Sequence, residues 1–330
     1  MSGRKKILAL GLAFLLVFCL AGTALAESGV EHRAVNIWSD GTRLAGDLYY
    51  PSGVKEGDKL PAILLCHGWG GVKSHLNQAY APFFAKAGYV VLTFDYRGWG
   101  ESDSRLVVRD KMPSRDGQGY VTVRAQAIRE LVDPLDQLVD IQSCLDFLYG
   151  EPMVNPNKIG LWGTSYGGGH VVYAATHDDR VKCVVSQVGG MDSRSSSLPW
   201  TKTEAMQKEV RQEAVKRARG EIDPVPQGGL PVGLFKGPWA QLTGTPYLSR
   251  MMDYSPIRYA DQLKVPILII EAEKDELMKP AEHGQRLYAL VKDRIPAEYW
   301  LFPGTHFEIY NQGRREAIQR AIAWYDRYLK

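Results

Sequence analysis

One serine lies in a sequence context that favours nucleophilic chemistry. Ser165 is the central residue of Gly-Thr-Ser-Tyr-Gly at positions 163–167, between an apolar run at 159–162 and a helical pattern that begins at Val171. A serine in so tight a turn from strand to helix has a strained backbone, and the flanking glycines are needed because a Cβ there would collide with the neighbouring strand and helix. The hydroxyl is then presented at a helix N-terminus, where backbone N–H groups favour negative charge. We therefore expect Ser165 to be a nucleophile.

A nucleophilic serine requires a general base, and the base requires an acid that orients it. Reactive groups in open α/β sheets gather at the carboxyl ends of the strands. Two predicted strands, at 265–271 and 297–302, are followed by Asp275 and His306. The chain order serine, acid, histidine is that of the strand–turn–helix hydrolase motif. We predict His306 as the base and Asp275 as the acid, with Glu276 as the alternative because a one-residue error in the turn would exchange the two.

The oxyanion of a tetrahedral intermediate requires backbone N–H donors placed where its charge develops. We predict that Tyr166, directly after the serine, provides one of them. The second is expected from the loop after the strand at 60–66, where we choose Trp69 in the sequence His-Gly-Trp-Gly-Gly. His67 in the same loop is expected to hold the loop by hydrogen bonds rather than to act as a base.

Strand patterns alternate with helical patterns along most of the chain. Strands are predicted at 33–38, 44–50, 60–66, 89–94, 159–162, 181–188, 265–271 and 297–302. Helices are predicted at 74–87, 134–149, after Ser165, and at 280–291 and 314–329. The first two strands form a hairpin around Asp40 and Gly41. This alternation predicts an α/β fold with a mostly parallel sheet and helices on both faces.

Two segments interrupt the alternation. Residues 103–133 are polar and irregular, and we predict a long loop with some helix near 123–131. Residues 191–256 contain a charged helix at 204–219 and a stretch rich in glycine and proline. We expect them to form a helical and loop cap, inserted over the sheet of a single domain that spans residues 27–330.

The N-terminus has the features of a secretory signal peptide at residues 1–26. Three basic residues precede an apolar run at 7–20, and Ala24 and Ala26 form a small-residue cleavage site. We expect export to the periplasm or the medium after cleavage near Ala26, with an uncleaved membrane anchor as the alternative. The leader contains three basic and no acidic residues, so its removal cancels the formal net charge of +3. The rest of the chain has a formal net charge of zero, and its sequence shows no basic patch of the kind that binds nucleic acid or a membrane surface.

Three cysteines follow the leader, at Cys66, Cys144 and Cys183, each within an apolar pattern. Their odd number favours buried free thiols, with a Cys144–Cys183 disulfide as the alternative. Neither the histidines nor the cysteines show metal-ligand spacing, so we expect no metal. Nothing in the sequence indicates an oligomeric state.

Five motifs in this order resemble the α/β-hydrolase superfamily: HGWGG, DYRGWGES, GTSYGG, EKDEL and GTHFE. The likeness covers nearly all of residues 33–330, and within the superfamily the chain is similar to the dienelactone-hydrolase-like and Xaa-Pro-dipeptidyl-peptidase-like esterases and peptidases. It implies Ser165 as nucleophile, Asp275 and His306 as its partners, and no cofactor. A dienelactone hydrolase proper has a cysteine nucleophile, from which this chain departs. Asp95 and Arg97 match the second motif and are expected to have structural roles.

These features predict an exported serine hydrolase that cleaves carboxylic esters through an acyl-enzyme. Its partner would be a small-molecule ester. A peptidase that acts on short peptides with the same residues is the first alternative. A non-catalytic binding protein on a hydrolase fold is the second, because a fold does not determine a function.

Overall fold

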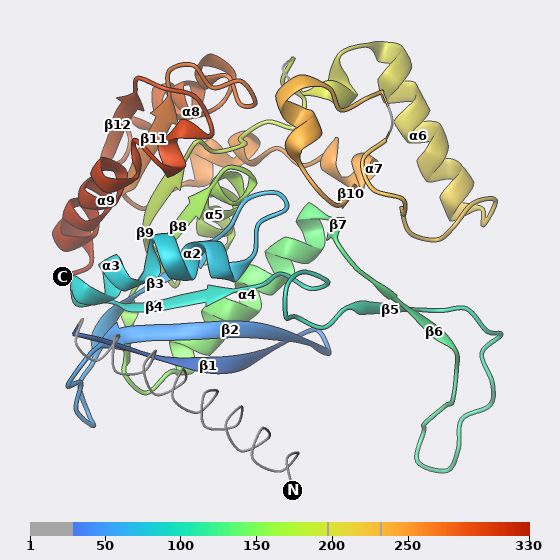
Figure 1. The fold of residues 1–330 in the computed structure, drawn as a ribbon, viewed down its shortest axis with the longest axis horizontal. Coiled ribbons are helices and arrows are strands. Elements are labelled where there is room, and N and C mark those ends of the chain that lie inside the picture. The colour runs from blue at the N-terminus through green and yellow to red at the C-terminus, as the bar shows by residue number, and fades with distance from the viewer. Residues whose placement is uncertain (1–28, 197, 232) are drawn as a thin grey trace, which may run out of the picture.

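An eight-stranded sheet organises the protein, whose computed structural model describes residues 29–196, 198–231 and 233–330 (Figure 1). The strand order is β1-β2-β4-β3-β8-β9-β11-β12. The strands are β1 (Val30–Ser39), β2 (Thr42–Pro51), β3 (Leu60–Cys66), β4 (Val90–Phe94), β8 (Val154–Thr164), β9 (Val181–Gln187), β11 (Ile267–Ala272) and β12 (Ala297–Phe302). β2 alone runs opposite to the other seven strands of this sheet. The predicted mostly parallel sheet with an initial hairpin is confirmed.

Helices cover both faces of this sheet. One face packs against α4 (Pro134–Gly150), α5 (Tyr166–His177) and α8 (Gly284–Val291), and the other against α2 (Lys73–Ala79), α3 (Ala81–Lys86) and α9 (Arg314–Tyr328). Successive side chains of a strand point to opposite faces. In β3, Leu64 therefore packs on the first face, whereas Ile63 and Leu65 pack on the second. Burial on both sides explains why these strands are continuous apolar runs.

Two expected helices are interrupted. The helix predicted at 74–87 is divided into α2 and α3, because Pro82 lacks an N–H group and is accommodated in the first turn of a new helix. The helix predicted at 280–291 is a short 3₁₀ helix, η4 (Pro280–Glu282), followed by α8. His283 separates them in a non-helical conformation, and its ring Nδ1 accepts a hydrogen bond from the backbone N–H of Met191 at 3.0 Å.

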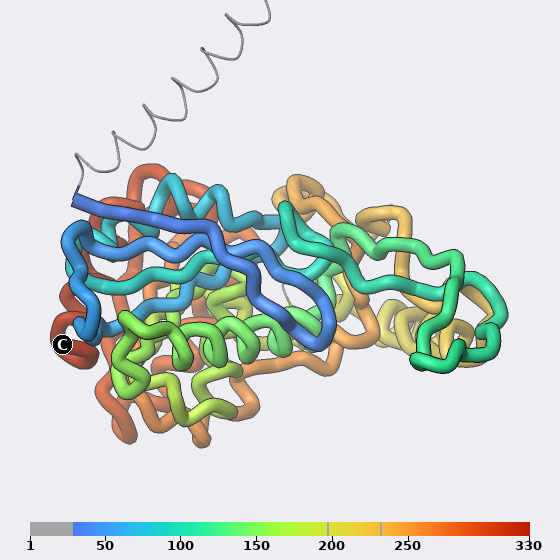
Figure 2. The backbone as a smooth tube through the Cα atoms, turned by 90° about the horizontal axis from the view of Figure 1, so that it is seen from below, coloured from blue at the N-terminus to red at the C-terminus, as the bar shows by residue number. Residues whose placement is uncertain are grey.

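Residues 105–128 form a β-hairpin, here called the arm, and the helix predicted near 123–131 is wrong. Its strands β5 (Arg105–Val108) and β6 (Ala125–Ile128) pair only with each other. Figures 1 and 2 show that the arm projects from the body beside the cap. Most residues of β6 are exposed. The arm therefore has no buried stripe whose period would identify its conformation in the sequence.

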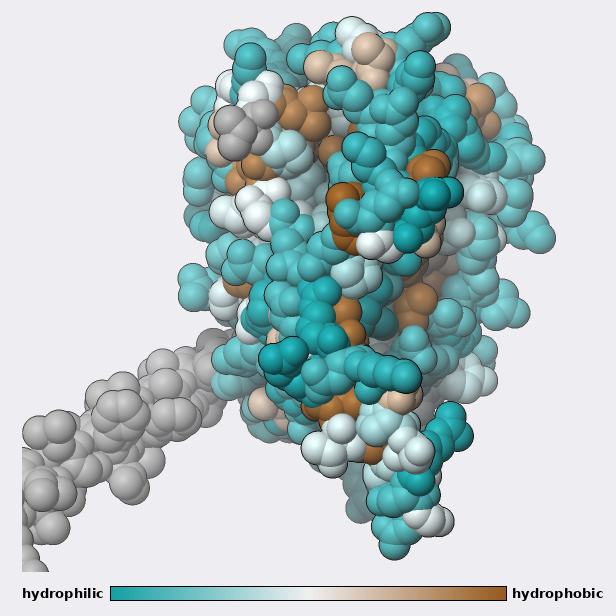
Figure 3. Space-filling model, turned by 90° about the vertical axis from the view of Figure 1, so that its right-hand side faces the viewer, coloured by the Kyte–Doolittle hydropathy of each residue, from teal (hydrophilic) through white to brown (hydrophobic). Residues whose placement is uncertain are grey.

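The predicted cap lies over one end of the molecule. Its elements are η1 (Pro199–Thr201), α6 (Glu204–Ala218), η2 (Gly237–Gln241), β10 (Thr245–Pro246) and α7 (Leu248–Met251), and η3 (Pro256–Gln262) returns the chain to the sheet. β10 pairs with β7 (Leu131–Val132) at the base of the arm. Farther out, Arg109 of the arm forms an ion pair with Asp223 of the cap at 2.8 Å. Figure 3 shows that this end of the molecule is mainly hydrophilic, with apolar residues in separate patches.

The state of the cysteines and the presence of membrane-spanning helices can both be examined in the described residues. Cys66, Cys144 and Cys183 are free and buried, so the free thiols are confirmed and the Cys144–Cys183 disulfide is wrong. Burial raises the pKa of each thiol. Within the described ranges, we find no helix with the length and apolar character that a membrane crossing requires. The predicted leader at 1–26 lies outside the described residues.

Candidate active site

Ser165 stands between β8 and α5 with a positive φ of 55°, the strained turn that its motif predicts. The structure explains the glycines on either side. A Cβ on Gly163 would lie 2.2 Å from the backbone oxygen of Gly167 in α5. A Cβ on Gly167 would lie 2.4 Å from the backbone oxygen of His67, next to β3. Glycine is therefore required at both positions because helix and strand approach the turn too closely for a side chain.

The three residues predicted to act together are in hydrogen-bonding contact. His306 Nε2 lies 3.1 Å from Ser165 Oγ, and His306 Nδ1 lies 2.7 Å from Asp275 Oδ2. Because an ionised carboxylate only accepts, Nδ1 carries the proton and Nε2 is left to accept one from the serine. The other carboxylate oxygen of Asp275 accepts hydrogen bonds from the backbone N–H groups of Leu277 and Met278 at 2.8 and 2.6 Å. The acid is thus fixed in one orientation.

The alternative acid, Glu276, has a different place in the site. Its Oε2 accepts a hydrogen bond from the backbone N–H of His306 at 2.8 Å. Glu276 therefore holds the loop that carries the histidine, whereas Asp275 contacts the imidazole. The turn after β11 directs the two neighbouring acids to different atoms of His306: Asp275 contacts the ring Nδ1, and Glu276 contacts the backbone N–H.

The two predicted oxyanion donors belong to segments that flank the serine. Tyr166 is the first residue of α5, so its backbone N–H has no acceptor within the helix. Trp69 follows Gly68, whose hypothetical Cβ would lie only 2.7 Å from Ser165 Cβ. This glycine brings the loop after β3 against the serine. Burial lowers the pKa of His67 in this loop to about 4, which keeps its ring neutral.

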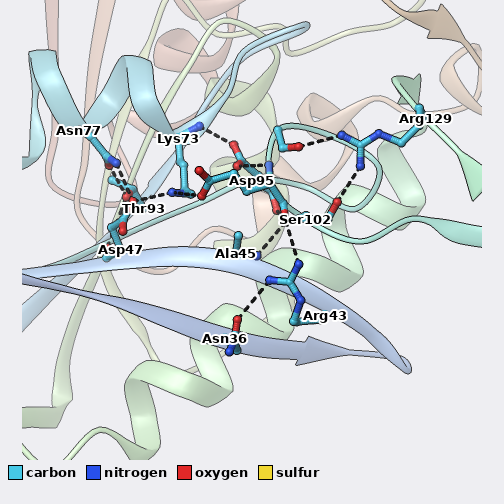
Figure 4. A network of polar contacts seen from close by, with 12 residues as sticks. Asn36, Arg43, Ala45, Asp47, Lys73, Asn77, Thr93, Asp95, Ser102 and Arg129 are labelled. Carbon is cyan, nitrogen blue, oxygen red and sulfur yellow. Dashed lines mark hydrogen bonds and ion pairs between the residues drawn. The ribbon is translucent and has the colours of Figure 1, made fainter. Parts of the chain in front are cut away.

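Asp95 fixes the end of the loop after β3, at the point where α2 begins (Figure 4). Its carboxylate accepts hydrogen bonds from the backbone N–H groups of Lys73, where α2 begins, and of Glu101, at 2.7 and 2.9 Å. Ser102 donates to the backbone oxygen of Asp95 at 2.6 Å. Burial raises the pKa of Asp95. The DYRGWGES motif therefore connects β4 to the start of α2, the structural role expected of it.

Arg97 of the same motif is also structural. It forms an ion pair with the buried Asp140 of α4 at 2.7 Å and also donates a hydrogen bond to Ser39 Oγ at 2.9 Å. These contacts involve α4 on the face of the sheet that α5 and α8 also cover, and Arg97 does not line the cavity at Ser165. It links β1, α4 and the loop after β4.

A cavity of about 400 Å³ opens beside Ser165. Its wall contains no Asp, Glu, Lys or Arg side chain among the described residues, and most of it is apolar or aromatic. The apolar lining includes Leu76, Leu242, Leu277 and Phe307. The polar exceptions, besides Ser165 and His306, are two histidines and three hydroxyl side chains. The cavity therefore suits a neutral ligand that has few polar atoms.

The cap contributes an aromatic cluster behind this cavity. The ring of Trp69 packs against Trp200 and Phe235 at centroid distances of 6.0 and 5.6 Å. Its indole Nε1 donates a hydrogen bond to the backbone oxygen of Thr243 at 2.9 Å. The side chain of Trp69 thus anchors the cap, while its backbone belongs to the loop beside Ser165.

The sequence did not reveal the three hydroxyl residues of the cavity wall, Tyr80, Thr164 and Tyr310. Tyr310 ends a short 3₁₀ helix, η5 (Glu308–Tyr310), four residues after His306. That spacing is one helical turn and was the only available signal for it. No group of three or more metal-ligating side chains occurs among the described residues.

Comparisons with known proteins agree with this architecture. Residues 40–308 match the family model described as X-Pro dipeptidyl-peptidase (S15 family). The chain is 30% identical over 293 residues to an uncharacterized 31.7 kDa protein of the traX-finO intergenic region of Escherichia coli, covering 84% of this chain and 94% of that one. The crystal structure of PA2218 from Pseudomonas aeruginosa superposes with a TM-score of 0.69 at 24% identity, over 91% of this chain and 94% of that one. The Pyrococcus furiosus esterase Pf2001 has the same fold, with a TM-score of 0.60 at 17% identity over 92% and 95% of the two chains.

Proposed function

Because the chain belongs to the X-Pro dipeptidyl-peptidase (S15) family of α/β-hydrolases, we propose that it is a serine hydrolase that cleaves neutral carboxylic esters through an acyl-enzyme. The observation that carries this proposal is the pair of hydrogen bonds made by His306, to Ser165 and to Asp275. A base that contacts both the nucleophile and its orienting acid is the arrangement that acyl transfer requires.

In the proposed reaction, Ser165 Oγ attacks the ester carbonyl while its proton passes to His306 Nε2. Asp275 stabilises the resulting imidazolium. The backbone N–H groups of Tyr166 and Trp69 stabilise the oxyanion of the tetrahedral intermediate. His306 then gives its proton to the departing alcohol. In the second half, His306 takes a proton from water, the hydroxide attacks the acyl-enzyme, and the proton returns to Ser165 as the acid is released.

The cavity supports an ester rather than a peptide with a free amino terminus. Such a peptide carries an ammonium group, which must be paired when it is removed from water. The described wall of the cavity offers no carboxylate side chain for it, because Asp275 is turned toward His306 behind the wall. A neutral acyl group of modest size is compatible with about 400 Å³ of mainly apolar space. The family match favours a peptidase as the second candidate.

Hydrolysis of p-nitrophenyl esters from acetyl to palmitoyl, by the wild type and by Ser165→Ala, tests the proposal. We expect turnover by the wild type only, with a chain-length optimum set by the cavity. Dipeptide p-nitroanilides are measured in parallel. Release of nitroaniline without ester turnover would support the peptidase. A folded protein that hydrolyses neither class and does not react with a serine-directed phosphonate would be a binding protein.

We also propose that residues 1–26 direct export, on the basis of their basic, apolar and small-residue segments. Expression of the full chain followed by N-terminal sequencing of the exported product tests this. A mature protein that begins at residue 27 is expected. A membrane-bound product that keeps Met1 would instead support the anchor.

A further inference from the structure

Three hydroxyl groups interrupt the apolar wall of the cavity beside Ser165. They belong to Tyr80, Thr164 and Tyr310. They are connected through Gln187, the last residue of β9, which is fully buried. Gln187 Nε2 lies 3.2 Å from the hydroxyl of Tyr80 and 3.1 Å from Thr164 Oγ1, and Thr164 Oγ1 lies 2.9 Å from the hydroxyl of Tyr310.

Counting protons assigns the donor in two of these three hydrogen bonds. An amide nitrogen carries two protons and no acceptor site, so Gln187 donates one proton to Tyr80 and one to Thr164. The oxygen of Thr164 accepts from Gln187, and either hydroxyl of the Thr164–Tyr310 pair can donate to the other. When Thr164 is the donor, the phenolic proton of Tyr310 is left to be donated to another acceptor.

The serine oxygen is the acceptor available to that proton. Tyr310 and Ser165 line the same cavity, and the hydroxyl of Tyr310 contacts that of Thr164, the residue directly before Ser165. Ser165 donates its own proton to His306, so the lone pairs of its oxygen remain free to accept. The ring of Tyr310 lies against His306, with a centroid distance of 6.0 Å and an interplanar angle of 65°. Burial raises the pKa of Tyr310 above its ordinary value, so the phenol keeps its proton.

We propose that Tyr310 is a catalytic residue whose phenol donates a hydrogen bond to Ser165 Oγ when negative charge develops there. This inference rests on the proposed function of Ser165 as nucleophile. Charge develops on Oγ twice: as the serine proton moves to His306 during attack, and as the bond from Oγ to the acyl carbon breaks during deacylation. Tyr310 transfers no proton in either step. The proton that returns to Oγ comes from His306, which has taken it from water.

This donor complements the oxyanion hole. The backbone N–H groups of Tyr166 and Trp69 serve the carbonyl oxygen of the substrate, whereas Tyr310 serves the oxygen of the enzyme. Thr164 and Gln187 are positioning residues that orient the phenol. Deacylation depends most on Tyr310, since an aliphatic alkoxide is a poorer leaving group than the p-nitrophenolate expelled in acylation.

The test replaces the hydroxyl and keeps the ring. Tyr310→Phe retains the packing against His306, and Tyr325→Phe is the matched control because Tyr325 donates its hydroxyl to the backbone oxygen of Leu161, in the same strand as Thr164. Stopped-flow release of p-nitrophenol from p-nitrophenyl butyrate measures acylation as a burst and deacylation as the steady rate. Thermal melting of each variant is recorded in parallel.

We expect Tyr310→Phe to lower kcat about tenfold, as for the loss of a hydrogen bond to a charged group. KM should fall with kcat and the burst should grow, because the acyl-enzyme accumulates. Thr164→Val should change these values in the same direction by a smaller factor, and Tyr325→Phe should leave them unchanged while lowering the melting temperature. A merely structural role of Tyr310 would lower the melting temperature without enlarging the burst.

A kcat of Tyr310→Phe within twofold of the wild type would overturn the inference. If Tyr310→Phe does not fold, an unchanged burst and kcat in Thr164→Val would overturn it instead. Ser165→Ala is assayed in parallel, and its activity distinguishes an error in the role of Tyr310 from an error in the proposed function. Full activity without the serine would refute both, whereas a dead Ser165→Ala with a normal Tyr310→Phe would refute only the role of Tyr310.

Discussion

The backbone N–H of Lys73 is bonded to the carboxylate of Asp95 at 2.7 Å, and this contact joins the first turn of α2 to the end of β4. The loop that contains Trp69 lies immediately before Lys73. A residue that never contacts the cavity thus determines where one predicted oxyanion donor can lie.

Asp95→Ala should therefore impair catalysis as well as stability. The substitution leaves the backbone N–H groups of Lys73 and Glu101 without their acceptor, and the loss at the buried Lys73 alone costs about 1–3 kcal/mol. We expect a lower melting temperature and a kcat/KM for p-nitrophenyl esters reduced about tenfold or more. Asp103→Ala is the control, since Asp103 pairs with Arg43 on the surface. Equal kcat/KM values for the two variants would contradict this account.

The two neighbouring acids after β11 should differ sharply in their effect on kcat. Asp275→Asn removes the charge that orients His306 and stabilises its imidazolium, and we expect a loss of about 10⁴-fold. Glu276→Gln keeps an oxygen that can accept from the backbone N–H of His306, so its loss should be less than about tenfold. Steady-state kinetics on one ester, for two variants purified in the same way, decide the matter. Comparable losses would mean that Glu276 shares the role.

Gly163→Ala should prevent correct folding of the turn at Ser165. Its Cβ would meet the backbone of Gly167 at 2.2 Å, and neither backbone segment can yield without moving β8 or α5. We expect insoluble protein or a loss of several kcal/mol in the free energy of unfolding. Gly150→Ala is the matched control, because no heavy atom lies within 4 Å of a Cβ at that position. A soluble, active Gly163→Ala would show that the turn is less tightly enclosed.

Stability should fall as the pH is lowered from about 6.5, the pKa of histidine in an unfolded chain. Burial lowers the pKa of His170 to about 3 and that of His67 to about 4. Between these values and 6.5 the unfolded chain binds more protons than the folded one, so protonation favours unfolding, by about 1.4 kcal/mol per pH unit for each histidine. The full contribution is present above pH 6.5. Urea denaturation of the wild type and of His170→Leu between pH 4.5 and 7.5 measures this slope.

His170→Leu is expected to be less stable at neutral pH, because it loses hydrogen bonds to Tyr254 and Gln137. Its free energy of unfolding should nevertheless change less steeply with pH than that of the wild type. Parallel curves for the two proteins would mean that His170 is not the source of the pH dependence.

The sequence was most informative where burial imposes a pattern of apolar residues, and where residues capable of catalysis follow a strand directly. The continuous apolar runs of β3, β4 and β11 predicted the sheet because both of its faces are covered. The order of Ser165, Asp275 and His306 followed from their positions at strand ends. The arm was missed because β6 is mostly exposed and carries no apolar alternation. Tyr310 and the cavity were missed because they depend on how η5 packs beside β8, a long-range contact that leaves no local pattern.

Because its three described thiols are buried, the folded protein is insensitive to the redox state of its surroundings. Cys66, Cys144 and Cys183 lie in the core, unpaired, with their pKa values raised, so almost no thiolate is available to be oxidised or exchanged. Folding of the described residues therefore requires no disulfide bond. The same native structure should form under reducing and under oxidising conditions, so protein produced without residues 1–26 inside cells should have the same fold as protein produced in an oxidising compartment.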